Sequence, residues 1–298
     1  MRVLVAGGTG FIGSYLCRAL ADGGHEVTAL SRSPSETPDG VDSAVGDVTA
    51  YDSIAPAVDG HDAVVNLVAL SPLFEPKGGN VMHDRIHRAG TENLVRAAEE
   101  AGADRFVQLS ALGADPDGDT AYIRAKGQAE EIVAESDLDW TTFRPSVVFG
   151  EGGEFVSFTK RLKGMFAPLV PLYPLPGGGK TRFQPIHVED LVPMLVAALE
   201  ADEHVGETYE IGGPESLTLR EVTNLVYEAE RKGVTIVPLP MPLARLGLTV
   251  LGAVPGFPMG PDQYRSLKFD NTTADNDIGA FDVEASEMTT LAGYLGLD

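Results

Sequence analysis

Two groups of residues in this 298-residue sequence have types and spacings that could do chemistry. The first is the segment GGTGFIG at 7–13, which matches the G-x-G-x-x-G pattern and separates an apolar run from a helical pattern. Glycines permit a tight turn and let the backbone approach a pyrophosphate, which the helix N-terminus then binds. This segment therefore predicts a dinucleotide site. The residues expected to form it are Gly7, Gly10, Phe11, Ile12 and Gly13.

The second group is Tyr122 and Lys126 in the segment AYIRAK. Residues four apart lie on one face of a helix, about one turn from each other. A nearby ammonium favours the phenolate and so lowers the pKa of a tyrosine. Such a tyrosine can exchange a proton with an alcohol or carbonyl while a nicotinamide exchanges hydride. We expect Tyr122 as the acid/base, with Lys126 activating it and also holding the nicotinamide-side ribose.

The elements that must position these residues alternate between strands and helices in the first half of the chain. Short runs rich in Val, Leu and Ala predict strands, and segments of helical periodicity lie between them. Alternation at this spacing predicts a Rossmann-like, doubly wound parallel sheet in the α/β class. The expected strands are 2–6, 26–30, 43–46, 63–70, 105–109 and 140–143, and the expected helices are 14–22, 52–58, 82–101 and 122–135.

The pattern changes after Gly150, where Pro and Gly become frequent and the elements become shorter. We expect residues 1–150 to form the dinucleotide-binding domain. Residues 151–298 are expected to form a smaller α+β domain for a substrate or partner. Segment 183–203 regains a strand-and-helix pattern and is expected to return to the first domain.

The charge balance is strongly acidic, with 44 Asp and Glu against 22 Lys and Arg and a formal net charge of −22. Like charges at this density repel one another and destabilise the compact state in dilute buffer. At about 1 M salt the Debye length falls to about 3 Å, which screens the repulsion. This composition favours a halophilic protein over an acidic protein of an ordinary cell. It also argues against a nucleic-acid partner, because phosphate neutralisation needs a basic face.

A single cysteine, Cys17, excludes an intrachain disulfide and a cysteine-rich metal site. No metal site is expected. We find neither a signal-like segment nor 18 consecutive apolar residues, so the expected location is the cytoplasm.

Further motifs show a resemblance to a known family, the extended or atypical short-chain dehydrogenase/reductases, often labelled NAD-dependent epimerase/dehydratases. The resemblance covers essentially the whole chain. The motifs that carry it, besides GGTGFIG and the Tyr122/Lys126 pair, are GDV at 46–48, Gly90-Thr91-x-Asn93-Leu94, RPSVVFG at 144–150 and PIHVEDL at 185–191.

The resemblance implies roles for several further residues. Asp47 and Val48 are expected near the adenine, and the Ala69 region is expected to line the cofactor. The family usually ends its fifth strand with a Ser or Thr that polarises the substrate carbonyl. Here Ala111 takes that position and Ser110 lies one residue early, which turns its side chain to the other face of a strand. Ser110 is therefore a candidate catalytic helper, with a structural role as the alternative.

Another position, His87, stands where many members have a helix Asn that supports a proton relay; a histidine on the helix surface is the alternative. Two segments, SALGAD at 110–115 and DQYRSLKFDN at 262–271, are similar to one subgroup. That subgroup contains the nucleotide-binding accessory subunit of respiratory complex I and its prokaryotic relatives.

The end of the second strand indicates which cofactor is bound. NAD-specific members of the family place a carboxylate there, which bonds the ribose 2′-hydroxyl. Here the segment reads Leu30-Ser31-Arg32-Ser33 and has no carboxylate. An arginine can pair with a 2′-phosphate and stack on adenine, so Ser31 and Arg32 predict NADP(H), with NAD(H) as the alternative.

Two apolar stretches, Met165–Pro176 and Val237–Met259, bear on the substrate or partner. They could line a pocket for an apolar substrate, form an exposed surface for a partner or membrane, or be ordinary core. Three functions remain open. The first is an NADP(H)-dependent oxidoreductase acting on an alcohol or carbonyl. The second is a noncatalytic NADP(H)-binding subunit or assembly factor at the inner face of a membrane respiratory complex. The third is a nucleotide-sugar epimerase or dehydratase.

Overall fold

The computed structural model describes residues 1–33, 36–166, 172–252 and 259–297. These residues form two compact units, which are described separately. The first unit contains residues 1–70, 77–145 and 188–210, and the second contains residues 71–76, 146–187 and 211–298.

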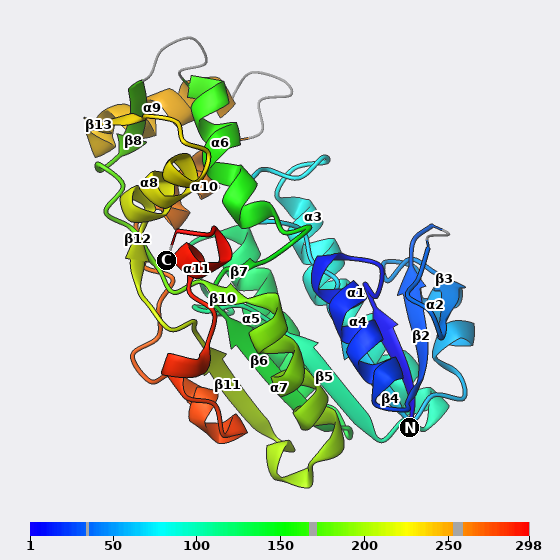
Figure 1. Ribbon diagram of the computed structural model, residues 1–298. Helices are drawn as coiled ribbons and strands as arrows, with labels where there is room; N and C mark the ends of the chain where they lie inside the picture. The colour runs from blue at the N-terminus through cyan, green and yellow to red at the C-terminus, as the bar shows by residue number, and fades with distance from the viewer. Residues whose placement is uncertain (34–35, 167–171, 253–258, 298) are drawn as a thin grey trace. The chain divides into compact units, whose positions relative to one another are not determined.

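A seven-stranded sheet with the order β11-β6-β5-β4-β1-β2-β3 forms the centre of the first unit (Figure 1). The pairs from β1 to β6 are parallel. The strands are β1 (Arg2–Ala6), β2 (Glu26–Ser31), β3 (Val41–Val45), β4 (Ala63–Asn66), β5 (Arg105–Leu109), β6 (Asp139–Pro145) and β11 (Glu207–Ile211). This order is that of a Rossmann-like doubly wound sheet, so the predicted fold class is confirmed. The chain reverses direction across the sheet between β1 and β4, which is where such folds bind ligands.

Helices pack in two groups within this unit. α1 packs against α7, while α2 and α5 pack against α4. The helices are α1 (Phe11–Asp22), α2 (Tyr51–Val58), α3 (Val81–His83), α4 (Ala89–Ala101), α5 (Ala121–Ala134) and α7 (Val188–Glu200). A π-helical turn at Asp84–Arg88 joins α3 to α4, and Asp202–His204 forms a 3₁₀ turn.

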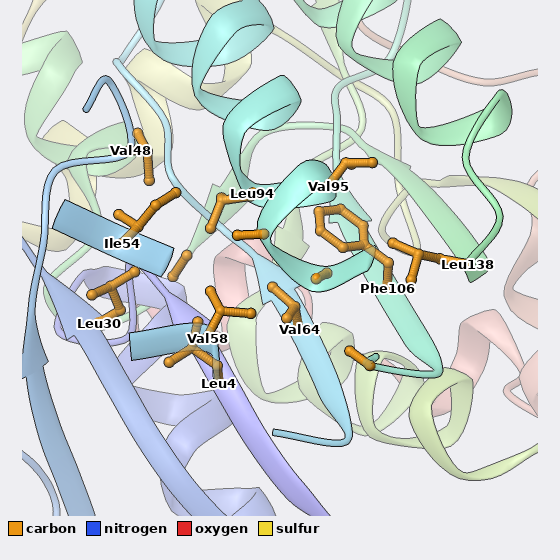
Figure 2. Close-up of a cluster of buried hydrophobic side chains, with 14 of the residues drawn as sticks. Leu4, Leu30, Val48, Ile54, Val58, Val64, Leu94, Val95, Phe106 and Leu138 are labelled. Carbon is orange, nitrogen blue, oxygen red and sulfur yellow. The ribbon is translucent and has the colours of Figure 1, made fainter. Parts of the chain in front are cut away.

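A buried apolar cluster joins the sheet to α2 and α4 (Figure 2). Leu4, Val64 and Phe106 from three neighbouring strands pack there with Ile54 of α2 and Leu94 of α4. All five side chains are fully buried. Burying each side chain of this kind stabilises the fold by about 1.5–3 kcal/mol. This cluster holds the strand ends that carry the candidate site.

Two elements differ substantially from the sequence predictions, while the ends of the other predicted elements agree to within three residues. The strand expected over 63–70 ends at Asn66, and residues 67–70 continue as irregular chain past the edge of the sheet. The segment 82–101, expected as one helix, contains the π-helical turn. The helical periodicity of its apolar residues does not reveal this turn. Both differences lie next to the candidate site.

The second unit is built from shorter elements. β7 pairs with β10, β8 with β13, and β9 with β12. Its strands are β7 (Val148–Phe149), β8 (Leu172–Pro176), β9 (Arg182–Phe183), β10 (Ile186–His187), β12 (Leu217–Thr218) and β13 (Thr235–Leu239). Its helices are α6 (Glu154–Phe166), α8 (Leu219–Ala229), α9 (Met241–Gly252), α10 (Pro261–Ser266) and α11 (Leu291–Tyr294), with 3₁₀ turns at Asp277–Phe281 and Ala285–Glu287.

Parts of the two apolar stretches, residues 167–171 and 253–258, lie outside the described residues. The part of the chain that the structure describes contains no helix that is long and apolar enough to span a membrane.

Candidate dinucleotide site and the tyrosine–lysine helix

The glycine segment forms a compact turn between β1 and α1. The Gly7 amide donates to the Leu30 carbonyl at 2.9 Å, and the Gly10 amide donates to the Gly7 carbonyl at 2.9 Å. Gly7 has a φ of +83°, in the left-handed region that glycine adopts without strain. Gly10 caps α1 with no side-chain hydrogen bond, and the first turn of the helix carries no acidic residue. The exposed helix terminus therefore keeps its positive dipole end for an anion.

Two of the glycines are required by packing rather than by φ. A Cβ on Gly13 would lie 2.2 Å from the Gly7 carbonyl oxygen and 2.7 Å from the Gly8 Cα. A Cβ on Gly8 would lie 2.7 Å from the Ala29 Cβ. The turn, the helix and the neighbouring strand approach one another so closely that side chains are excluded. This is the geometry of a cradle that a pyrophosphate can approach.

The GDV motif forms a second side of the same site. The Asp47 carboxylate accepts hydrogen bonds from the backbone amide of Thr49 at 2.9 Å and from its hydroxyl at 2.8 Å. Burial opposes ionisation of Asp47, but these two bonds outweigh it and hold its pKa below the usual value. The positive charges of Arg32 and Arg85 act in the same direction. Asp47 is therefore an ionised, preoriented acceptor.

Helix α4 holds this segment through its Gly90-Thr91-x-Asn93 motif. The Asn93 side-chain amide donates to the Val48 carbonyl at 2.8 Å. A Cβ on Gly90 would lie 2.8 Å from a Val48 methyl, so glycine lets the helix approach. The Thr91 hydroxyl accepts from the side-chain amide of Asn66 at 3.0 Å, at the end of β4. The motif thus fixes the position of two walls of the site.

A pocket of about 270 Å³ lies between these segments. Its lining residues are Gly7, Thr9, Gly10, Leu30, Ser31, Arg32, Ser33, Gly46, Asp47, Val48, Leu67, Val68, Ala69, Leu70 and Ile86. The structure therefore brings together seven of the predicted cofactor residues: Gly7, Gly10, Ser31, Arg32, Asp47, Val48 and Ala69. Four others, Phe11, Ile12, Gly13 and Lys126, do not line it.

The end of β2 presents basic and hydroxyl groups to this pocket. Arg32 is exposed, and the Ser31 hydroxyl donates to the Ser33 carbonyl at 2.7 Å. Asp47 is the one acidic residue among the lining residues. The second-strand position that bears a carboxylate in NAD-specific proteins is therefore occupied here by groups that suit an anion.

Helix α5 carries Tyr122 and Lys126 in its first two turns, and Thr120 caps it by accepting from the Ile123 amide at 3.2 Å. Lys126 is 2% exposed, and its Nζ donates to the Leu109 carbonyl at 2.7 Å, at the end of β5. Burial lowers the pKa of Lys126 to about 8, and the charge of Glu130 opposes this shift only in part. The ammonium is held in place at a cost in desolvation.

Tyr122 differs from the prediction in its ionisation. The sequence predicts a lowered pKa from the Lys126 ammonium, but burial raises the pKa of Tyr122 above its usual value. The reason is that desolvation disfavours the phenolate, while the Lys126 ammonium is bonded to the Leu109 carbonyl. In this structure Tyr122 is therefore a protonated phenol, ready to donate.

The end of β5 has no hydroxyl at the usual family position, which Ala111 occupies. Ser110 is 4% exposed, and its Oγ has no hydrogen-bond partner among the described residues. This hydroxyl lies one residue before the position that the family pattern predicts.

Comparison with known proteins places this site in a family. The family described as NAD(P)H-binding matches residues 7–163. The chain belongs to this family, the NAD(P)H-binding, epimerase/dehydratase-like short-chain dehydrogenase/reductases. The family resemblance that the motifs predict is therefore confirmed. The family is one that binds NAD(P)-type nucleotides.

Two relatives and one solved structure show the range of this family. The chain is 30% identical to a mitochondrial NADH dehydrogenase [ubiquinone] 1 alpha subcomplex subunit 9 of Arabidopsis thaliana, over 94% of this chain and 73% of the relative. It is 29% identical to a 3-beta-hydroxysteroid dehydrogenase of Mycolicibacterium neoaurum, over 76% of this chain and 70% of the relative. A nucleoside-diphosphate-sugar epimerase structure from Staphylococcus aureus matches all of both chains with a TM-score of 0.76 at 18% identity, which shows the shared fold.

Two histidines of this NAD(P)H-binding protein contact Tyr122 on helix α5, and the sequence analysis predicted neither contact. His87 is 2% exposed, so it is not a surface histidine, and it contacts the Tyr122 ring with centroids 5.3 Å apart. His83, which the sequence analysis did not single out, is also 2% exposed and lies 5.5 Å from the same ring. The one signal in the sequence for His83 was its spacing, because it lies four residues before His87, the position where many family members have an Asn.

Proposed function

We propose that this chain is an NADP(H)-dependent oxidoreductase acting on an alcohol or carbonyl group of an apolar small molecule. The observation that carries the proposal is the pairing of Tyr122 with a buried Lys126 one turn away on α5. Both residues lie in the same unit as the glycine cradle. A buried lysine with a lowered pKa costs stability, and such groups cluster at functional sites. The steroid dehydrogenase among the relatives supports this reading.

The roles follow from the chemistry of the groups. The bound cofactor would donate or accept hydride at the substrate carbon. In reduction, the substrate oxygen takes the proton of the Tyr122 hydroxyl and leaves a phenolate; in oxidation, Tyr122 must first lose its proton, and the phenolate then takes the proton of the substrate hydroxyl. Lys126 would hold the ribose and stabilise the phenolate that reduction leaves. Ser110 would assist by donating a hydrogen bond to the substrate oxygen.

Tyr122→Phe tests the proposal by removing the proton donor while keeping the ring. With NADPH and a panel of carbonyl substrates, we expect kcat to fall by about 100-fold or more, the usual contribution of a positioned acid. The Kd for NADPH should stay within about twofold, because Tyr122 is not among the residues that line the nucleotide pocket. Tyr51→Phe is the matched control, since Tyr51 lies on α2 and bonds Glu100. Full turnover by Tyr122→Phe would reject this mechanism.

We propose NADP(H) as the preferred cofactor because of Arg32. A guanidinium at the end of β2 can make charge-assisted hydrogen bonds to a 2′-phosphate, each contributing about 1.5–3 kcal/mol. Arg32→Ala should therefore weaken NADPH binding by about tenfold or more and leave NADH binding within about twofold. Calorimetric titration with both nucleotides measures this, with Arg18→Ala on the exposed surface of α1 as the control. An unchanged NADPH/NADH affinity ratio would contradict the assignment.

A noncatalytic NADP(H)-binding subunit or assembly factor of a membrane respiratory complex is the second candidate. The observation that favours it is an apolar stripe on α9, where Leu243, Leu246 and Val250 are 56%, 61% and 59% exposed. Exposed apolar surface of this kind is typical of interaction sites. Ala111 and the mitochondrial NADH dehydrogenase relative support the same reading. Copurification with respiratory subunits, together with turnover that does not depend on Tyr122, would favour this function over the first.

The third candidate, a nucleotide-sugar epimerase or dehydratase, rests on the broad family and on a shared fold. We further propose that the protein works in a salt-rich cytoplasm, with peripheral contact at the inner membrane face under the second function. The excess of Asp and Glu over Lys and Arg supports the proposed salt-rich location.

A further inference from the structure

Three aromatic rings meet at the start of α5, where His83 and His87 are buried and Tyr122 is partly buried. The His83 and His87 rings are stacked with centroids 5.5 Å apart and an interplanar angle of 16°. Tyr122 meets both rings edge-on, at 5.5 Å and 77° to His83 and at 5.3 Å and 90° to His87. Edge-to-face contacts of this kind are directional, so they hold a ring in one orientation. The cluster therefore restrains the side chain on which the proposed function depends.

The π-helical turn Asp84–Arg88 shapes this cluster. A π-helical turn contains one residue more than an α-helical turn, and one residue corresponds to a rotation of about 100° around a helix. The turn therefore changes the direction of the residues before it, including His83, relative to α4. π-helical turns inside α-helices are frequent at functional sites. Here His83 directly precedes the turn and His87 lies within it, and both rings contact Tyr122.

His87 is held as a neutral ring. Its Nε2 accepts a hydrogen bond from the Leu70 amide at 3.4 Å, which assigns the ring proton to Nδ1. Burial, the Lys126 ammonium and His83 all lower the pKa of His87 well below its usual value. A neutral ring adds no charge beside the phenol, so packing is the contribution that it makes to Tyr122.

We propose that His83 and His87 are positioning residues, whose stacked rings hold the Tyr122 phenol in the orientation that proton transfer to the substrate requires. The inference rests on the proposed function of Tyr122. It differs from a role in which a polar helix residue relays protons, because it depends on the shape of the rings and not on their nitrogens. A ring without nitrogen at either position should therefore preserve the function.

The test uses two substitutions at each histidine. His83→Leu and His87→Leu fill much of the space but remove the ring, while His83→Phe and His87→Phe restore a ring without nitrogen. His25→Leu is the control, because His25 pairs with Glu200 outside the cluster. The first readout needs no turnover: it is the NMR signal of Tyr122 in protein with ¹³C-labelled tyrosine, identified by its loss in Tyr122→Phe. The second is kcat and KM with NADPH and a carbonyl substrate.

In each Leu variant we expect the Tyr122 signal to shift and to titrate closer to the pKa of free tyrosine. We also expect kcat to fall about tenfold with KM within about twofold, and each Phe variant to recover at least half of the wild-type kcat. Wild-type signals and kcat in both Leu variants would overturn the proposal, and so would a failure of both Phe variants to recover. If the wild type turns over no carbonyl, the proposed function fails, and the NMR signal alone still decides whether the rings position Tyr122.

Discussion

Gly13→Ala is expected to abolish measurable NAD(P)H binding, with Kd raised by about 100-fold or more. The added Cβ would lie 2.2 Å from the Gly7 carbonyl oxygen, and its other near contacts at 2.7 and 2.8 Å are also backbone atoms. Backbone atoms cannot rotate away as a flexible side chain can, so the turn must open. Opening it moves the amides that would approach the pyrophosphate. Fluorescence titration with NADPH measures the loss.

The matched control for this prediction is Gly164→Ala. Gly164 also lies in a helix, α6, but nothing is within 4 Å of the position that its Cβ would occupy. Alanine favours a helix over glycine by about 1 kcal/mol, so this variant should bind NADPH as the wild type does and melt at the same temperature or higher. NADPH binding by Gly13→Ala within threefold of the wild type would show that the turn tolerates a side chain.

Thermal stability is expected to rise by roughly 10 °C or more between 0.1 M and 3 M KCl, a change on the order of several kcal/mol for a chain of this size. With 44 acidic and 22 basic side chains, at most half of the carboxylates can each have a cationic partner of their own. The remaining negative charges repel one another, and salt screens that repulsion. Calorimetry across a KCl series measures the change in melting temperature.

The shape of this salt dependence separates screening from general salting-out. Screening is nearly complete at about 1 M salt, where the Debye length is about 3 Å, so most of the rise should occur below that concentration. Exclusion of salt from the protein surface would instead give a steady rise at all concentrations. A melting temperature that does not change between low and multimolar KCl would contradict the proposed salt-rich location.

The pKa values of Tyr122 and Lys126 depend on the folded surroundings of the two side chains. From the sequence, an ammonium one helical turn from Tyr122 predicts a lowered tyrosine pKa. In the structure the Lys126 ammonium is bonded to the Leu109 carbonyl, and burial controls the pKa values of both residues. The spacing of two residues on a helix predicts that they share a face. It does not predict how much solvent each one loses.

Local features of the site were predictable from the sequence because residues that are close together in the sequence form them. The strand, turn and helix around Gly7–Gly13 follow one another without a gap, and their glycines and apolar residues act over a few positions. The absence of a carboxylate at the end of β2 was visible for the same reason. The alternation of strands and helices likewise determined the α/β sheet, since parallel strands need helical crossovers.

Tertiary structure alone decided how the walls of the site are held and what surrounds Tyr122. The bond from Asn93 to the Val48 carbonyl joins residues 45 positions apart. The rings of His83 and His87 meet Tyr122 through a π-helical turn and the packing of α4 against α5. Such contacts depend on distances that only the folded chain sets. The sequence by itself therefore determined the nucleotide cradle, and the packing of distant segments decided the environment of the side chain proposed to do the chemistry.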